Sequence, residues 1–147
     1  DLRFAIVPEF GMHTLGMFIN SNDFRYVEDD ERERVMTDLL YKTSVIIGQL
    51  RKTTSFSPLV LWENIFGYML WHFHTLLENP ALADRAFEDL DMLEDKNVWR
   101  HFSDKSLFLN YTGGKSPSAL INQPVRKSCC FSKDIPGLIA CGFCPIK

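Results

Sequence analysis

All four cysteines of the chain lie in its last nineteen residues, and this clustering is the feature best suited to chemistry. Cys129 and Cys130 are adjacent, ten residues follow, and Cys141 and Cys144 enclose two residues. Thiolates gathered in one short segment can hold a soft metal centre, because sulfur is a soft ligand. Residues 126–147 are therefore a candidate metal-binding segment.

Ligand chemistry leaves three interpretations of this segment. Four thiolates suit structural zinc, although zinc ligands usually come as two Cys-x-x-Cys pairs and only Cys141–Cys144 has that form. A [2Fe-2S] centre bound only by cysteine also needs four thiolates. A vicinal disulfide beside a separate redox Cys-x-x-Cys is the third interpretation, but nothing else in the chain indicates a thioredoxin-like context. On ligand chemistry alone, zinc and iron–sulfur are about equally well supported.

The adjacent cysteines make a specific demand on the backbone. Neighbouring side chains point apart in an extended chain, so Cys129 and Cys130 can reach one centre only through an unusual local turn. We therefore expect a strained or solvent-open geometry there. Cys141 and Cys144 form a simpler two-ligand clamp, since Gly142 leaves the backbone between them unobstructed.

The stretch from Arg126 to Pro145 resembles the C-terminal signature of the FhuF-type ferric-siderophore reductases. In that family a Cys-Cys pair, a ten-residue spacer and a Cys-x-x-Cys hold a [2Fe-2S] cluster. The likeness is close over the last twenty residues; further upstream it is loose and rests on Trp62, Asn64 and Gly67. Proteins of this family are commonly longer, so we expect the single domain 1–147 to be mainly the C-terminal part of a longer protein.

The resemblance implies a one-electron ferric-siderophore reductase in the cytoplasm. Its [2Fe-2S] cluster would be held by Cys129, Cys130, Cys141 and Cys144, and its substrate would be Fe(III) chelated by a hydroxamate-type siderophore. Reduction would release the iron, because Fe(II) is softer and binds hard oxygen ligands less tightly. A Cys₄ cluster with a potential near about −400 mV is a plausible donor. Two alternatives remain: a zinc-stabilised binding module without redox activity, and an iron–sulfur electron carrier or redox sensor.

Charge is unevenly distributed along the chain. Residues 1–99 carry nine Lys/Arg and seventeen Asp/Glu, a net charge of −8, whereas residues 100–147 carry seven and two, a net charge of +5. This asymmetry favours an acidic partner near the cysteines, such as a ferredoxin that donates the electron, over nucleic acid. Arg126, Lys127 and Lys133 flank the cysteines. They would favour a reduced cluster or steer the donor, with plain solubility as the alternative.

Other residues with chemical potential are better explained structurally. We interpret His13, His72, His74 and His101 as structural, because four cysteines already suffice as ligands. Gly113-Gly114-Lys115-Ser116 lacks the earlier glycine of a phosphate loop, since Leu109 occupies that position. The apolar run 59–77 contains Glu63, Asn64 and two histidines, which argues against a bilayer span. Its helix is most simply core, with a siderophore-binding or membrane-surface platform, at the inner face of the membrane, as the second interpretation.

The elements that must position the cysteines can be predicted from periodicity. Residues 3–10 and 14–19 are predicted as strands that could pair as a hairpin, with Gly11 in the turn. Apolar residues at steps of three and four predict helices over 28–52, 58–78 and 80–94, with Ser57 as the N-cap of the second. A short helix is possible near 117–122, and the cysteine segment is predicted as a loop turning at Pro136-Gly137. The fold class is thus predominantly helical α+β with a C-terminal iron–sulfur loop.

The same periodicity predicts which side of each helix faces the core. On the second helix the polar side should carry Glu63, Gly67, His74 and Glu78, and burial could extend round to Tyr68 and Trp71. The other predicted inward residues are Val35, Met36, Leu39, Leu40, Thr43, Ile46, Ile47 and Leu50 on the first helix, and Leu82, Ala83, Phe87, Leu90 and Leu93 on the third.

Overall fold

The structure is a computed structural model that describes residues 2–9, 12–20, 22 and 25–146. Two compact units make up the chain, residues 1–32 and 33–147, and each is described by itself. Helices dominate and a small two-stranded sheet accompanies them, which confirms the predicted helical α+β class. The prediction that residues 1–147 form one domain stays a prediction.

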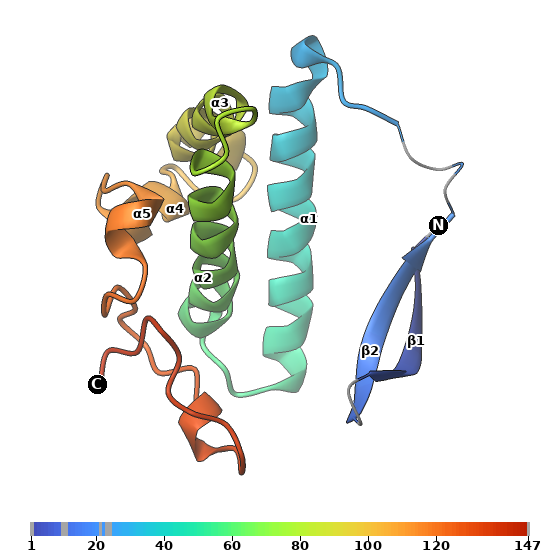
Figure 1. Ribbon diagram of the computed structural model, residues 1–147, viewed down its shortest axis with the longest axis vertical. Coiled ribbons are helices and arrows are strands. Elements are labelled where there is room, and N and C mark those ends of the chain that lie inside the picture. The colour runs from blue at the N-terminus through green and yellow to red at the C-terminus, as the bar shows by residue number, and fades with distance from the viewer. Residues whose placement is uncertain (1, 10–11, 21, 23–24, 147) are drawn as a thin grey trace. The chain divides into compact units, whose positions relative to one another are not determined.

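The N-terminal unit is built on a β-hairpin. Strands β1 (Leu2–Glu9) and β2 (Met12–Ile19) pair antiparallel, with Phe4 opposite Met17 and Pro8 opposite His13 (Figure 1). Both predicted strands and their pairing are confirmed, while Phe10 and the predicted turn residue Gly11 lie outside the described residues. A short 3₁₀ turn, Asp29–Glu31, leads into the first helix.

The first two long helices follow the sequence signals closely. Helix α1 (Arg32–Thr53) ends on Arg51 and Lys52, whose charges complement the negative end of the helix dipole. Helix α2 (Pro58–Leu77) begins as predicted, with Ser57 Oγ accepting a hydrogen bond from Leu59 N at 3.2 Å. Both predicted helices are confirmed within one residue at their C-terminal ends.

The later helices depart from the prediction. Helix α3 (Ala83–Glu94) begins three residues after the predicted start, because Asn79 Oδ1 accepts a hydrogen bond from Ala81 N and holds residues 80–82 in a turn. A 3₁₀ helix (Lys96–Trp99) and helix α4 (Leu107–Thr112) were not predicted, since neither is long enough to show a period. Helix α5 (Pro117–Leu120) lies where a short helix was considered possible.

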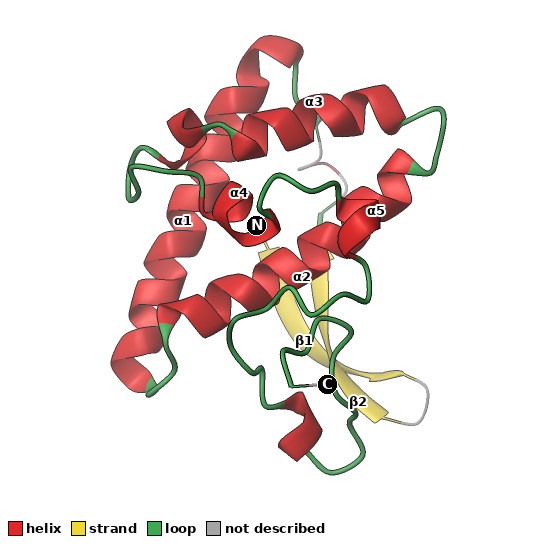
Figure 2. Ribbon diagram, turned by 90° about the vertical axis from the view of Figure 1, so that its left-hand side faces the viewer, coloured by secondary structure: helices red, strands yellow, loops and turns green. Residues whose placement is uncertain are grey.

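Helix α2 is central to the C-terminal unit and contacts α3, α4 and α5 (Figure 2). Its Trp62 and Phe66 rings lie 5.4 Å apart and both contact Trp99, while Phe66 also meets Phe108 edge-on. The indole N–H of Trp99 donates to Leu93 O at 2.8 Å, so this large side chain is buried without an unpaired donor. This aromatic centre fixes α2, the helix that carries the cysteine segment.

Several burial predictions are wrong. Leu39, Ile46 and Leu50 of α1 are exposed, and only Thr37, Leu40 and Ile47 are buried, so the buried stripe is narrower than the sequence period indicates. For the third helix, the predicted burial of Leu90 and Leu93 is confirmed, whereas Leu82 and Phe87 are exposed and Ala86, which was not predicted, is buried. No helix in the described part of the chain is long and apolar enough to cross a bilayer.

Candidate metal centre

The cysteine segment is largely irregular, as predicted. After α5 the chain continues through Arg126 to Cys129 and Cys130, forms a 3₁₀ turn at Ser132–Asp134, bends at Gly137 and returns to Cys141 and Cys144. Gly137 has φ 84°, a left-handed conformation that glycine adopts at little cost, which confirms the predicted turn. The segment lies along one side of α2, in orange to red in Figure 1.

A buried ion pair anchors the start of this segment on α2. Glu63 is 1% exposed and Arg126 is 5% exposed, and Arg126 Nε lies 3.9 Å from Glu63 Oε2. Arg126 also donates to Asn64 Oδ1 at 2.6 Å and to Val60 O at 3.4 Å. Two opposite charges can be buried together only where hydrogen bonds replace their hydration, and these contacts provide that replacement.

The Glu63 carboxylate also binds the backbone just before the cysteine pair. It accepts hydrogen bonds from Lys127 N at 2.8 Å, from Ser128 N at 2.9 Å and from the Ser128 hydroxyl. Two consecutive amides are thereby fixed one residue before Cys129. The sequence prediction that placed Glu63 on the polar side of the helix is wrong, because this carboxylate lies under the segment rather than in solvent.

A second contact holds the other end of the segment against the same helix. Phe143 is 5% exposed and packs over Gly67, where an added Cβ would lie 3.3 Å from the phenyl ring. The carbonyl of Phe143 accepts a hydrogen bond from Arg126 N at 3.4 Å, which links the two ends of the segment. Residues 60, 63, 64, 67 and 71 lie along one face of α2, so this helix presents a continuous track to the cysteine segment.

A left-handed residue follows the adjacent cysteines. Phe131 has φ 61°, a left-handed conformation that non-glycine residues rarely adopt, and its N–H donates to Cys129 Sγ at 3.3 Å. The next residues form the 3₁₀ turn Ser132–Asp134. The chain therefore bends sharply directly after Cys130, and the expectation that a turn brings the sulfurs of both cysteines to one centre stays a prediction.

Cys130 and Cys141 are brought into contact from opposite sides of the loop. Burial raises the pKa of the Cys130 thiol, but hydrogen bonds with Ser132 and Cys141 and the charge of Arg126 outweigh burial, so the pKa is lowered. For Cys141, burial and the hydrogen bond with Cys130 raise the pKa. Cys130 is thus the better thiolate of the pair and Cys141 the donor to it.

The remaining two cysteines are close by but are not gathered into one group. Cys144 is buried and its N–H donates to Cys141 O at 3.1 Å, whereas Cys129 is half-buried. Among the described residues, no group of three or more His, Cys, Asp or Glu side chains is placed to hold a metal ion. Binding by all four sulfurs would require Cys129 and Cys144 to approach the Cys130–Cys141 pair.

The three predicted basic neighbours have different surroundings. Arg126 is buried against Glu63, so neither solubility nor long-range steering explains it. Lys127 and Lys133 are exposed. Asp134 raises the pKa of Lys133, with smaller contributions from Cys129 and Cys144. The Lys133 ammonium therefore lies near Cys129 and Cys144, the two cysteines outside the Cys130–Cys141 contact. Lys127 and Lys133 are therefore the two exposed cations of the three.

Sequence reasoning missed a buried tyrosine beside the centre. Tyr111 Oη alone among the described buried side-chain nitrogen and oxygen atoms has no hydrogen-bond partner. Burial raises the Tyr111 pKa to about 12, with Arg126, Glu63 and Cys141 as the charges that act on it. A neutral hydroxyl without a partner is a donor available to a sulfur ligand, so the residues present suit an anionic sulfur centre. No pattern around residue 111 in the sequence indicates this position.

An open cavity of about 520 Å³ lies between α2 and the cysteine segment. Its lining includes Cys130 and Cys141 together with Tyr68 and Trp71, which α2 presents to it. The prediction that burial extends round the helix to Tyr68 is wrong, since that side chain is 81% exposed. The contact pair of cysteines thus faces a space large enough for a small molecule.

Comparison of the chain with models of known families, with curated proteins and with solved structures gave no match. The likeness to the FhuF-type reductases therefore stays a prediction that depends on the cysteine spacing and its flanking residues.

Proposed function

We propose that the chain binds a [2Fe-2S] cluster through Cys129, Cys130, Cys141 and Cys144 and reduces ferric hydroxamate-type siderophores by one electron, releasing Fe(II). The observation that carries the proposal is the anchoring of the cysteine segment on α2 by the buried Glu63–Arg126 pair. A buried ion pair is costly to maintain, so a tail without a function would not need one. When bound, the cluster supplies an electron at low potential.

The chain's own residues would hold the sulfur ligands and leave them room to adjust. The segment is fixed at Arg126–Ser128 and at Phe143, whereas residues 131 and 133–139 between the anchors are exposed. Because this stretch is exposed, Cys130 and Cys141 at its two ends can move toward Cys129 and Cys144, which lie next to the two anchors. Because Glu63 compensates the charge of Arg126, the main contribution of Arg126 is to fix the position of the cysteine pair on α2.

The electron donor would be an acidic protein such as a ferredoxin. Lys127 and Lys133 are exposed on either side of Cys129-Cys130 in a part of the chain with net charge +5 over residues 100–147. Complementary charge raises the rate of encounter and is weakened by salt. Reduction of an imported chelate would take place in the cytoplasm, with association at the inner face of the membrane as a further prediction.

The cofactor is tested first by spectroscopy of the purified protein. We expect a red-brown protein whose visible absorbance bleaches with dithionite, an EPR signal in the reduced sample, and two irons per chain because a [2Fe-2S] cluster holds two. Serine substitution of any of the four cysteines should abolish or strongly reduce the signal. His72→Ala is the matched control, since His72 is exposed on α2 and four cysteines suffice as ligands.

Two results would contradict the proposal at different points. A colourless protein with bound zinc would favour the zinc-stabilised binding module. A reduced cluster that leaves ferric hydroxamates unreduced in stopped-flow mixing would favour an electron carrier or redox sensor, with the cluster retained.

A further inference from the structure

The cavity beside the cysteines has two apolar sides. Tyr68 and Trp71 lie on successive turns of α2 and form one side, and Leu138 and Ile139 of the cysteine loop belong to the lining as well. Tyr68 is 81% exposed, Trp71 43% and Ile139 85%, so large apolar groups stay in contact with water around an open cavity. Exposed aromatic and aliphatic side chains grouped around one cavity are typical of a ligand site.

The described part of the lining offers no unpaired cation. Among the described residues, Arg126 is the only member of the lining of the Asp, Glu, Lys and Arg types, and it is already bound to Glu63, Asn64, Val60 and Ser128. An anionic ligand would lose hydration on entering and find no unpaired cation in return. An uncharged ligand with an apolar exterior meets no such penalty.

Cys130 and Cys141 lie in the same lining, so a ligand in the cavity sits against two of the proposed sulfur ligands. An electron donor has to be close to its acceptor, and proximity to these sulfurs is what a substrate site requires. An uncharged trihydroxamate chelate of iron matches both observations, since its oxygens surround the metal and its methylene chains face outward.

This inference rests on the proposed function: we propose that this cavity is the substrate site and that Tyr68 and Trp71 hold the uncharged chelate beside Cys130 and Cys141. Tyr68 is a positioning residue, because it binds the apolar exterior of the chelate and takes no part in electron transfer. The iron is substrate here and leaves as Fe(II) when the chelate has accepted one electron.

Binding is measured with gallium(III) chelates, because Ga³⁺ resembles Fe³⁺ in size and charge but is not reduced. Titration of the full chain with gallium desferrichrome, an uncharged trihydroxamate, is followed by calorimetry and by tryptophan fluorescence. We expect one site per chain, and a loss of affinity of about five- to tenfold in Tyr68→Ala, from the loss of one aromatic contact. The trianionic gallium enterobactin should bind more weakly at physiological salt.

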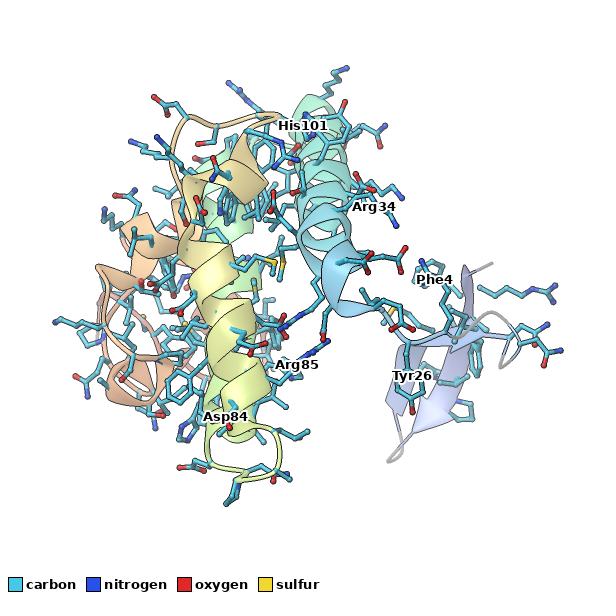
Figure 3. All side chains as sticks on the ribbon, turned by 90° about the horizontal axis from the view of Figure 1, so that it is seen from above. Phe4, Tyr26, Arg34, Asp84, Arg85 and His101 are labelled. Atoms are coloured by element: carbon cyan, nitrogen blue, oxygen red, sulfur yellow. The ribbon has the colours of Figure 1, made fainter. Side chains whose placement is uncertain are left out.

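Two further variants keep the test interpretable. Tyr26→Ala is the matched control: Tyr26 is 95% exposed on the N-terminal unit, outside the cavity, and is labelled in Figure 3. Its affinity should equal that of the wild type. Ile139→Ser changes the loop side of the cavity at a position that is 85% exposed, so folding should be retained and affinity should fall.

The outcomes separate this inference from the proposed function. Unchanged gallium desferrichrome affinity in both Tyr68→Ala and Ile139→Ser, or tighter binding of the trianionic chelate, would overturn the cavity assignment. Wild-type reduction of ferric hydroxamates by Tyr68→Ala at limiting substrate would do the same. A protein that binds the uncharged gallium chelate as expected but never reduces the iron chelate would contradict the proposed activity alone.

Discussion

Glu63 is the residue on which the arrangement of the centre depends most. One carboxylate compensates the buried Arg126 and accepts hydrogen bonds from two backbone amides that precede the cysteines. Because it is 1% exposed, water cannot replace it when it is changed. Its loss would leave a buried cation without a partner, which is costlier than removal of the whole pair.

Glu63→Gln should therefore lower the free energy of unfolding by about 3–5 kcal/mol. Glutamine keeps the shape and can still accept one hydrogen bond, so the cost comes mainly from the uncompensated Arg126. Denaturant unfolding measures the stability, and amide hydrogen exchange at Lys127 and Ser128 reports the local loss of anchoring.

Glu78→Gln is the matched control at the C-cap of the same helix, since that side chain is 67% exposed and its loss should cost less than about 1 kcal/mol. Adding Arg126→Met to Glu63→Gln should restore part of the lost stability, because no buried charge then remains. Equal effects of Glu63→Gln and Glu78→Gln would contradict the role given to the buried pair.

At the scale of elements, α2 uses one set of residues to pack into the core and another set to hold the cysteine segment. Trp62, Phe66, Leu70 and Phe73 pack into the core, while Glu63, Asn64, Gly67 and Trp71 face the cysteine segment and its cavity. Gly67 is needed at the close approach of Phe143, because a Cβ there would meet the ring at 3.3 Å. A glycine inside a helix otherwise weakens it.

Two glycine substitutions test this close approach. Gly48→Ala on α1 meets no atom within 4 Å and should raise the free energy of unfolding by about 0.5–1 kcal/mol. Gly67→Ala should gain less or lose stability, because the Phe143 ring must shift by a few tenths of an ångström. Thermal unfolding of both variants measures the difference, and an equal gain from each would argue against tight packing of Phe143 on α2.

At the scale of the whole molecule, the C-terminal unit contains every residue assigned to the centre and to the cavity. The core residues and the cysteine segment all lie between Glu33 and Lys147. An isolated two-stranded hairpin is at best marginally stable in water, so the N-terminal unit supplies little stability by itself. Stability and chemistry should thus reside in the helical unit.

A fragment of residues 33–147 should fold on its own. We expect its free energy of unfolding to lie within about 1 kcal/mol of that of the full chain, because the hydrophobic core is internal to this unit. Circular dichroism and denaturant unfolding of the two proteins check this, together with iron content. An unfolded or aggregated fragment would show that residues 1–32 are required for the fold.

The sequence by itself determined the elements whose signals are local. The cap Ser57-Pro58, the charges at the end of α1 and the turn at Gly137 each depend on neighbouring residues, and all are present in the structure. The four candidate ligands could also be named from their spacing alone, and the structure brings two of them, Cys130 and Cys141, into contact.

Only the tertiary structure decided which residues meet. Glu63 and the Lys127 amide are 64 positions apart, and nothing local to either residue records their hydrogen bond. In the same way, helical periodicity gave the apolar residues of α1 but not that Leu39 and Ile46 are exposed while Leu40 and Ile47 are buried. Burial depends on what lies opposite a side chain, and that is set by contacts between distant segments rather than by the period of one helix.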